Sequence, residues 1–218
     1  MSYRDYKQFA FGRYVHLYNR GNEKKAIFLD DQDYWNYLKR LSILLGVEES
    51  RKEIGGRLRL TAFQRGTFSF TCYCLMPNHF HFCLRQNNDT TPSTLISRVC
   101  TSYAKYFNKK YSRVGHLFQD KFKMVAIDND AQLAAVSAYI HQNPKVAGLV
   151  REPDQWPYSS YGEYMQGREA LCEHSGIMDL FKSRDEYKRF VDERYEEIVK
   201  HKQAEFETFD EENAKDGL

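Results

Sequence analysis

The run from Tyr73 to Leu84, with the sequence YCLMPNHFHFCL, constrains the fold more than any other part of the chain. Proline and asparagine at positions 77 and 78 predict a turn, because proline cannot donate to a central β-ladder and asparagine favours turns. Polar and apolar residues then alternate, as on a β-strand whose successive side chains point to opposite faces. The pattern places His79, His81 and Cys83 on one face of a strand that starts at a sheet edge or rim. The other face points into a core and consists of Phe80, Phe82 and Leu84.

Two histidines on one strand face suit a divalent metal ion, since neutral imidazole nitrogens are common metal ligands in proteins. His79 and His81 are therefore candidate ligands. The alternative is a strand whose histidines face solvent and bind nothing. A zinc site that includes Cys72 and Cys74 is a further option, although the usual C-x2-C spacing is missing.

Length and composition indicate one main globular domain, with 218 residues of which 42% are hydrophobic. The sequence contains no run of eighteen apolar residues and begins without the apolar segment of a signal peptide, so we expect a soluble protein in the cytoplasm. The five cysteines are odd in number, which favours reduced, buried thiols over a disulfide framework.

The net charge of +2 hides an uneven distribution. Residues 182–218 hold twelve Asp and Glu against eight Lys and Arg, so the rest of the chain carries +6. The stretch 98–123 holds seven Lys and Arg against the single acid Asp120, interleaved with aromatic residues. This composition is typical of a groove for single-stranded nucleic acid, while the alternative is a solvated helix face with its aromatics in the core. The predicted DNA contacts, which also include a residue at the end of the first strand, are Arg20, Lys105, Tyr106, Lys109, Lys110, Arg113, His116, Lys121 and Lys123.

Strands and helices are expected to alternate along the chain. Turn residues, helix caps and hydrophobic periodicity predict a strand at 14–19, a helix from Asp30-Asp31 to about Leu45, a hairpin of 58–63 and 67–75 joined by Gln64 to Gly66, the histidine strand, a helix that begins at Thr91-Pro92, a strand at 122–127, and a helix that starts at 128–130 and is ended at about Asn143 by Pro144. This order is that of a ferredoxin-like split βαβ fold with an added helix. The predicted class is α+β, with helices packed on an antiparallel sheet.

The added helix carries Tyr139 and Asn143, which lie one turn apart on the same face. A phenol is a poor nucleophile at neutral pH, but it can attack phosphorus when it is placed in line with a phosphate polarised by a metal. The chain has sixteen tyrosines, so spacing alone favours a place for Tyr139 in the core or on the surface over a role as nucleophile.

Several motifs in order resemble the single-tyrosine HUH transposases, and in particular their REP-associated tyrosine transposase branch. They are YNRGN at 18–22, CLMPNHFH at 74–81, GHLFQDKFK at 115–123, YIHQNP at 139–144 and WPYSSY at 156–161. The resemblance covers roughly residues 10–165.

The resemblance implies that His79 and His81 bind a divalent ion, either Mg²⁺ or Mn²⁺, that Asn143 is its third ligand and that Tyr139 is the nucleophile. It also implies a cut in single-stranded DNA beside a hairpin, with a 5′-phosphotyrosine on the enzyme and a free 3′-hydroxyl that can reverse the step and join strands. Many relatives have tyrosine where this chain has His141, so the role of that position stays open. We expect a monomer or homodimer at the nucleoid.

Residues 1–175 are predicted to form the catalytic domain, and 176–218 a charged helical appendage with an acidic end. The apolar stripe of this appendage would dock on the body or on a second copy, and its negative charge argues against DNA contact. Two other functions remain open from the sequence. One is a hairpin-binding protein without catalysis, and the other is a zinc hydrolase that uses His79, His81 and a cysteine.

Overall fold

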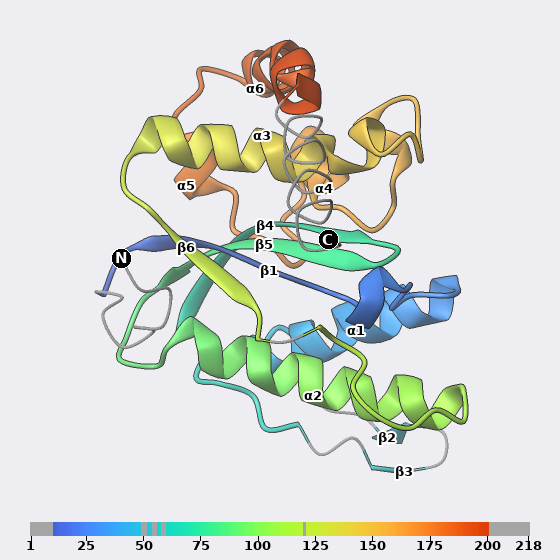
Figure 1. Ribbon diagram of the computed structural model, residues 1–218. Coiled ribbons are helices and arrows are strands. Elements are labelled where there is room, and N and C mark those ends of the chain that lie inside the picture. Colours follow the sequence, from blue (N-terminus) through green and yellow to red (C-terminus); the bar gives the residue numbers. More distant parts are fainter. Residues whose placement is uncertain (1–10, 49–51, 54–55, 58–59, 120, 201–218) are drawn as a thin grey trace, which may run out of the picture.

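The computed structural model describes residues 11–200 except 49–51, 54–55, 58–59 and 120. Its centre is an antiparallel sheet with the strand order β4-β5-β1-β6. In Figure 1, α1 and α2 lie on one side of this sheet and α3 to α6 on the other. The order β1-α1-β4-β5-α2-β6-α3 confirms the predicted split βαβ arrangement with an added helix. The bounds are β1 Tyr14–Arg20, α1 Asp31–Leu44, β4 Phe68–Met76, β5 His79–Gln86, α2 Pro92–Lys110, β6 Lys123–Ile127, α3 Asp130–Val146, α4 Tyr161–Gln166, α5 Ser175–Met178 and α6 Arg184–Glu193.

Four shorter elements complete the described part of the chain. The two-residue strands β2 (Lys52–Glu53) and β3 (Gly56–Arg57) pair with each other between α1 and β4. The 3-10 turns η1 (Asn22–Lys24) and η2 (Pro153–Gln155) follow β1 and α3.

The hairpin of the sheet is formed by β4 and β5, with Pro77-Asn78 as its turn and Met76 paired with His79. The turn predicted there is confirmed, whereas the predicted hairpin between 58–63 and 67–75 is wrong. Residues 58–59 lie outside the described chain, and 60–63 form no strand. The physical reason is that β4 is already bonded on both edges, to β5 and to the segment 156–160 described below.

The apolar face of β5 forms the centre of the core. Tyr37 of α1 packs against Phe80 and Phe82, with ring centroids 5.5 and 6.1 Å apart, and meets Tyr103 of α2 at 5.0 Å. Asp30 caps α1 by accepting a hydrogen bond from the Asp33 N–H, as its position before the helix predicts. The face that the sequence assigned to the core is therefore the one that α1 and α2 cover.

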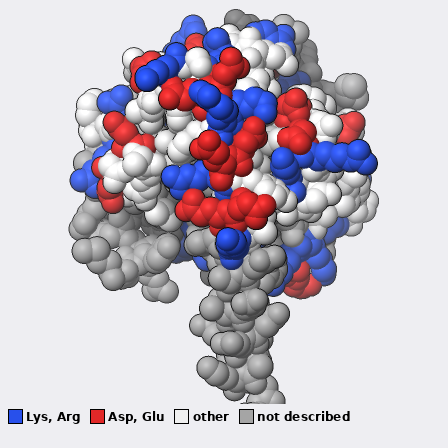
Figure 2. Space-filling model, turned by 90° about the horizontal axis from the view of Figure 1, so that it is seen from above, with Lys and Arg blue, Asp and Glu red and all other residues white. Residues whose placement is uncertain are grey.

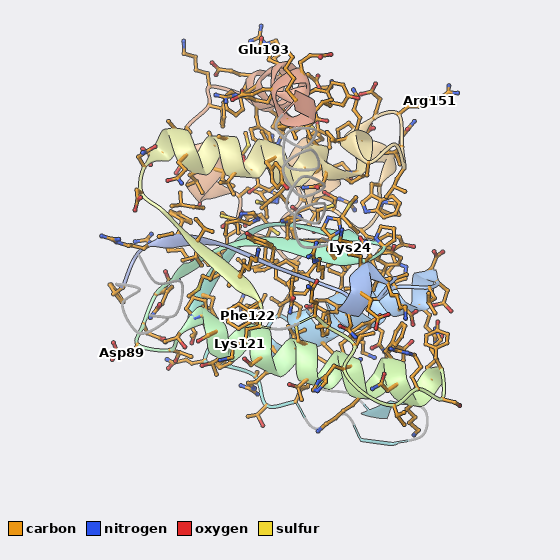
Figure 3. All side chains as sticks on the ribbon, in the orientation of Figure 1. Lys24, Asp89, Lys121, Phe122, Arg151 and Glu193 are labelled. Carbon is orange, nitrogen blue, oxygen red and sulfur yellow. The ribbon has the colours of Figure 1, made fainter. Side chains whose placement is uncertain are left out.

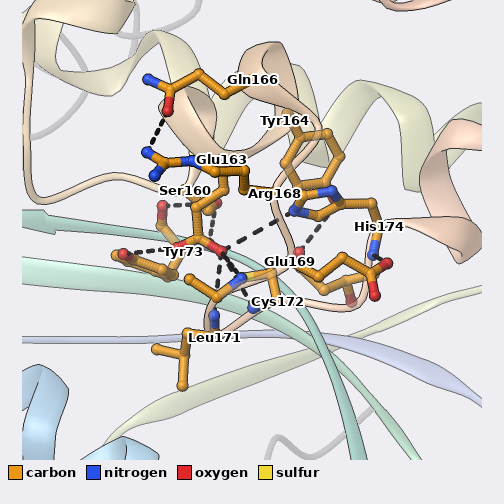
Figure 4. A network of polar contacts seen from close by, with 12 residues as sticks. Tyr73, Ser160, Glu163, Tyr164, Gln166, Arg168, Glu169, Leu171, Cys172 and His174 are labelled. Carbon is orange, nitrogen blue, oxygen red and sulfur yellow. Dashed lines mark hydrogen bonds and ion pairs between the residues drawn. The ribbon is translucent and has the colours of Figure 1, made fainter.

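The outer edge of β4 is covered by residues 156–173. Tyr158 and Ser160 exchange backbone hydrogen bonds with Leu75 and Tyr73, at 2.9 and 3.0 Å, and the Trp156 indole donates to the Leu75 carbonyl. Figure 4 shows the anchor of the following loop, the Glu163 carboxylate, which accepts from the backbone N–H groups of residues 170–172 and from the Tyr73 hydroxyl at 3.1 to 3.3 Å. The edge groups of β4 are thus satisfied within the chain.

Helix α3 extends to Val146, so the prediction that Pro144 ends it near Asn143 is wrong. Proline removes one intrahelical hydrogen bond, but bonds from the Ala147 N–H to Asn143 and from the Leu149 N–H to Pro144, both 3.0 Å, continue the turn. The helix therefore holds Asn143 within a regular turn.

The C-terminal helix α6 docks on α3 of the same chain. Tyr187 and Val191 are fully buried, and the Tyr187 hydroxyl donates to Ser137 at 3.1 Å while the Gln142 amide donates to the Val191 carbonyl at 2.9 Å. Of the two docking partners considered for the apolar stripe, the body is the one observed. The domain boundary at 175 stays a prediction, and the acidic end at 205–216 lies outside the described residues.

The surface over α6 carries positive and negative side chains intermixed (Figure 2), with ion pairs Lys188–Asp192 and Arg194–Glu197 at 2.8 Å. No helix in the described part of the chain is long and apolar enough to cross a membrane.

Candidate functional site

The second face of β5 turns toward α3 and not to open solvent. The strand register pairs His81 with Tyr18 of β1 and with Cys74 of β4, and pairs His79 with Arg20. His81 is only 5% exposed, while His79 is half-buried. The alternation read from the sequence is confirmed, and its polar face lies under α3.

The two strand histidines meet at right angles. Their ring centroids are 5.1 Å apart with an interplanar angle of 90°. The Nδ1 atom of His79 lies 2.7 Å from the Asn78 amide oxygen. Side chains two residues apart on one strand face thus bring two nitrogen donors to one place, as the sequence predicted.

Tyr139 of α3 faces this histidine pair. Its half-buried ring stands edge-on to His81, with centroids 5.4 Å apart at 89°, and lies 6.0 Å from the ring of His16. Asn143, one turn further along α3, is fully buried, and its amide nitrogen donates to the Tyr139 carbonyl at 2.9 Å. Helix α3 therefore places Tyr139, the predicted nucleophile, at the histidine face. Asn143, the predicted third ligand, lies one helical turn further along.

His16 of β1 belongs to the same cluster, and sequence reasoning missed it. Its ring stacks on His81 with centroids 5.1 Å apart at 24°, and its Nε2 lies 2.9 Å from the His81 Nδ1. Burial lowers the pKa of His16 to about 4, so its imidazole is neutral at pH 7. The alternation of Tyr14, His16 and Tyr18 was a signal for a shared face, but the partner strand and register were needed to place it against His81.

Three of the motif segments converge at one end of the sheet. The Gly21 N–H donates to the Asn78 carbonyl at 2.7 Å, and the Asn22 N–H donates to the Leu117 carbonyl at 2.9 Å. A side chain on Gly21 would collide with the Lys25 carbonyl, which explains why glycine stands there. The strand end at Arg20 thus lies at the rim that carries His79, as expected.

Lys110 and Tyr106 have partners inside the molecule, and their contact with DNA stays a prediction. The Lys110 ammonium lies 2.8 Å from both Asp30 and Asp33, and the Tyr106 hydroxyl donates to Asp33 at 3.1 Å. Asp33 is fully buried and also accepts from the Tyr111 hydroxyl at 2.8 Å. These groups stabilise the contact of α1 with α2, because a buried carboxylate requires close donors.

The other basic residues divide between two regions. Lys105 and Lys109 are exposed on α2, the helix on the side of the sheet away from α3, and Arg113 and His116 are exposed in the loop that follows. Lys121 is also exposed and precedes β6 (Figure 3). Lys123 of β6 is exposed above the ring of Tyr18, with its ammonium 5.9 Å from the ring centroid, and is thereby linked to the histidine face. Arg20 donates to the Gln119 amide oxygen, and its contact with DNA stays a prediction.

His141, whose role the sequence left open, points away from the site. It is fully buried, with Nδ1 2.7 Å from the Tyr187 hydroxyl and Nε2 2.8 Å from the Ser160 hydroxyl. Burial lowers its pKa to about 3, so it is a neutral side chain that ties α3 to α4 and α6.

The described residues hold no group of three or more His, Cys, Asp or Glu side chains that could bind a metal, which disfavours the zinc site with a cysteine. All five cysteines are free thiols, and four of them are buried.

Comparisons with known proteins agree with this architecture. Residues 49–143 match the family model described as "Transposase IS200 like". A protein of Haemophilus influenzae that is named as a REP-associated tyrosine transposase is 30% identical over an alignment of 105 residues, and the match covers 43% of this chain and 59% of that protein. The chain thus spans less than two thirds of the length of this relative.

A solved structure shares the fold. It is a REP-associated tyrosine transposase bound to a REP hairpin, with a TM-score of 0.55 and 17% identity over 84% of this chain and 95% of the other. The two proteins thus share the α+β fold, an antiparallel sheet with packed helices. The resemblance indicated by the sequence motifs is confirmed: the chain is similar to the IS200-like transposases over residues 49–143 and to REP-associated tyrosine transposases.

Proposed function

We propose that this chain is a metal-dependent enzyme that nicks and rejoins single-stranded DNA beside a hairpin through a phosphotyrosine at Tyr139. The observation that carries the proposal is the edge-on placement of the Tyr139 ring against His81, next to His79 on the same strand face. The similarity to REP-associated tyrosine transposases, one of them bound to a REP hairpin, supports the reaction class and the DNA partner.

The donor set suits Mg²⁺ or Mn²⁺. His79 and His81 would supply imidazole nitrogens, and Asn143 would supply its amide oxygen, since its amide nitrogen already donates to the Tyr139 carbonyl. A hard amide oxygen beside two imidazoles, without thiolate, admits either Mg²⁺ or Mn²⁺. When bound, the ion acts as a Lewis acid on a non-bridging phosphate oxygen.

Tyr139 carries the covalent step. Its phenol oxygen gives up a proton and attacks the phosphorus, the bond from phosphorus to the 3′ oxygen breaks, and that oxygen takes up a proton. The tyrosyl ester keeps the energy of the phosphodiester, so attack by a 3′-hydroxyl in the reverse direction joins strands. Helix α3 holds the phenol over the histidine face before DNA binds, which reduces the entropic cost of reaching the reactive geometry.

DNA would approach the rim where β1 ends and β6 begins. Arg20 and Lys123 belong to these strands, and Lys121 precedes β6. Their positive charge suits phosphates, and contacts of this kind provide affinity without sequence specificity. Such an enzyme would act on the nucleoid in the cytoplasm, as a monomer or a homodimer.

The test is incubation of the full chain with labelled single-stranded hairpin DNA and Mn²⁺, followed by denaturing electrophoresis. We expect a protein–DNA adduct that survives denaturation, and mass spectrometry should place the nucleotide on Tyr139. His79→Ala and His81→Ala should each lose the adduct and keep most hairpin binding, because phosphate contacts provide the affinity.

Two outcomes would contradict the proposal. Tight, salt-sensitive hairpin binding without any adduct across a range of hairpins would identify a binding protein. A nucleotide found on another tyrosine would show that the site is assigned to the wrong residue.

A further inference from the structure

Both strand histidines have their Nδ1 atom engaged by a neighbouring side chain. The Nδ1 of His79 lies 2.7 Å from Asn78 Oδ1, and the Nδ1 of His81 lies 2.9 Å from His16 Nε2. An imidazole has two ring nitrogens, and the hydrogen bond made by one determines which of them carries the proton. The partners of Nδ1 therefore decide whether Nε2 is a lone-pair donor.

Asn78 has a defined orientation. Its amide nitrogen donates to the Lys24 carbonyl at 3.0 Å, and this nitrogen can only donate. Its oxygen therefore faces His79, and an oxygen of this kind can only accept, so the proton lies on the His79 Nδ1. The lone pair of that ring is then on Nε2.

Lys24 is itself held in place, so the orientation of Asn78 is built into the backbone. Lys24 adopts a φ of 59°, a conformation uncommon for a residue with a side chain. The turn is closed by the Lys24 N–H, which donates to the Gly21 carbonyl at 3.0 Å, while the Gly21 N–H donates to the Asn78 carbonyl at 2.7 Å. The turn after β1 and the turn before β5 are thus joined by hydrogen bonds, and Asn78 connects them to His79.

His16 has the corresponding place beside His81. It lies on β1 two residues before Tyr18, which is the direct partner of His81 in the sheet. In the contact between His16 Nε2 and His81 Nδ1, one nitrogen donates and the other accepts. Only the arrangement in which His81 donates leaves a lone pair on its Nε2.

We propose that Asn78 and His16 are positioning residues that hold His79 and His81 protonated at Nδ1, so that Nε2 of each ring carries the lone pair that would bind a divalent ion. The inference rests on the proposed function, because it takes the two histidines as metal ligands. Removal of such partners of ligating histidines typically lowers metal affinity about 10- to 100-fold.

The first experiment measures the tautomers directly in the full chain without metal, by nitrogen NMR of imidazole-labelled protein. We expect His79 and His81 to carry their protons on Nδ1. A proton on Nε2 of either residue would overturn the assignment for that residue, whether or not the chain cleaves DNA.

The second experiment measures the dissociation constant of Mn²⁺, without DNA, by electron paramagnetic resonance of the free ion. Asn78→Ala and His16→Phe should each weaken binding about 10- to 100-fold. His16→Phe keeps a flat ring against His81 and removes the acceptor, so a merely structural role would leave the affinity unchanged. Asn78→Asp keeps the oxygen and should retain most of the affinity.

Asn87→Ala is the matched control, because Asn87 follows the far end of β5 and also donates through its amide nitrogen, to Gly66 and Ser69. Its Mn²⁺ affinity should equal that of the parent protein. Unchanged affinity in both Asn78→Ala and His16→Phe would overturn the inference while adduct formation by the parent chain still stood. Loss of the adduct in the parent chain with the expected tautomers would instead contradict the proposed function alone.

Discussion

Two polar clusters lie on opposite sides of the sheet, and they use their side chains differently. In the Asp33 cluster, defined as Asp33, Lys110, Tyr106 and Tyr111, an ammonium and two hydroxyls converge on one buried carboxylate at 2.8 to 3.1 Å. In the histidine cluster, defined as His16, His79, His81 and Tyr139, the contacts are ring stacking, ring edges and imidazole nitrogens.

The difference shows which polar groups serve the fold and which can serve chemistry. A buried charge is stable only when its partners are close, so the groups of the Asp33 cluster are committed to one another. Imidazole nitrogens and a phenol can each donate or accept a hydrogen bond, so under the proposed function they could exchange partners when a metal ion and a phosphate bind. Tyrosine occurs in both clusters, and its neighbours decide its role.

Removing one tyrosine hydroxyl from each cluster should give the largest difference between an effect on activity and an effect on stability. Tyr139→Phe should lower adduct formation at least about a thousandfold, because it deletes the attacking oxygen, and should change the free energy of unfolding little. Denaturing gels with labelled hairpin DNA and urea unfolding measure the two quantities. Tyr111→Phe is the control with the opposite pattern. It should still form the adduct, and the free energy of unfolding should fall by about 1.5–3 kcal/mol, because a hydrogen bond to the Asp33 carboxylate is lost. Adduct formation by Tyr139→Phe at the parent level would remove the distinction.

Breaking the Asp33 cluster should affect the fold and leave the histidine cluster intact. Asp33→Ala leaves Lys110 with Asp30 alone and should lower the free energy of unfolding by about 3–5 kcal/mol. Mn²⁺ affinity, measured at a temperature where the variant is folded, should not change. Asp89→Ala, at an exposed loop position, is the control and should stay within about 0.5 kcal/mol of the parent. A loss of metal affinity in Asp33→Ala would show that the two clusters are coupled.

His141 sharpens the comparison, because it is two residues from Tyr139 and yet belongs to the fold. Its pKa is lowered to about 3 by burial, below the value of about 6.5 in an unfolded chain. Between pH 3 and pH 6.5 the unfolded chain therefore binds a proton at His141 that the folded chain does not bind. The contribution of neutral His141 to the free energy of unfolding is complete above pH 6.5 and decreases as the pH falls. We expect a loss of about 3 kcal/mol from this group between pH 7 and pH 4 in urea unfolding without metal. The pH dependence should be shallower in His141→Gln, and an equal slope would contradict the assignment.

The smallest expected effect is on the salt dependence of hairpin binding, and it should differ between Lys110 and Lys109 of α2. Lys110→Met should lower stability and leave the salt dependence of hairpin binding unchanged, because its ammonium is paired with Asp30 and Asp33. If Lys109 and Arg113 contact phosphates, their joint replacement by Ala should reduce the salt slope by about 1.4, at about 0.7 per contact on a single strand. A filter-binding series across salt concentrations measures both. A lower salt slope in Lys110→Met would indicate that Lys110 contacts a DNA phosphate.

Local patterns were sufficient to predict much of the fold and part of the site. The alternation around His79 and His81 identified the face of β5, and Asp30 and Thr91 marked the starts of α1 and α2, because these signals lie within a few residues of what they determine. The spacing of Tyr139 and Asn143 likewise placed both on one turn of α3.

Features that depend on distant partners could not be predicted. Lys110 was read as a DNA contact because its partner Asp33 is far upstream, and His16 was missed because its hydrogen bond to His81 joins residues 65 positions apart. The same limit explains the wrong hairpin, since β4 received its second neighbour from residues 156–160, which a reading of adjacent segments does not reveal.

The covering of β4 by residues 156–173 also limits how two copies of the chain can associate. A sheet that continues from one subunit into another requires free backbone N–H and C=O groups along an edge strand. At β4 these groups are already bonded to Tyr158, Ser160 and Trp156. Among the described residues β6 pairs only with β1, so a dimer with a continuous intersubunit sheet would have to join at β6. That edge begins with the exposed Lys123, and such a dimer would bring two copies of this lysine, and with them the two rims at which we propose DNA binds, close to the interface between the subunits.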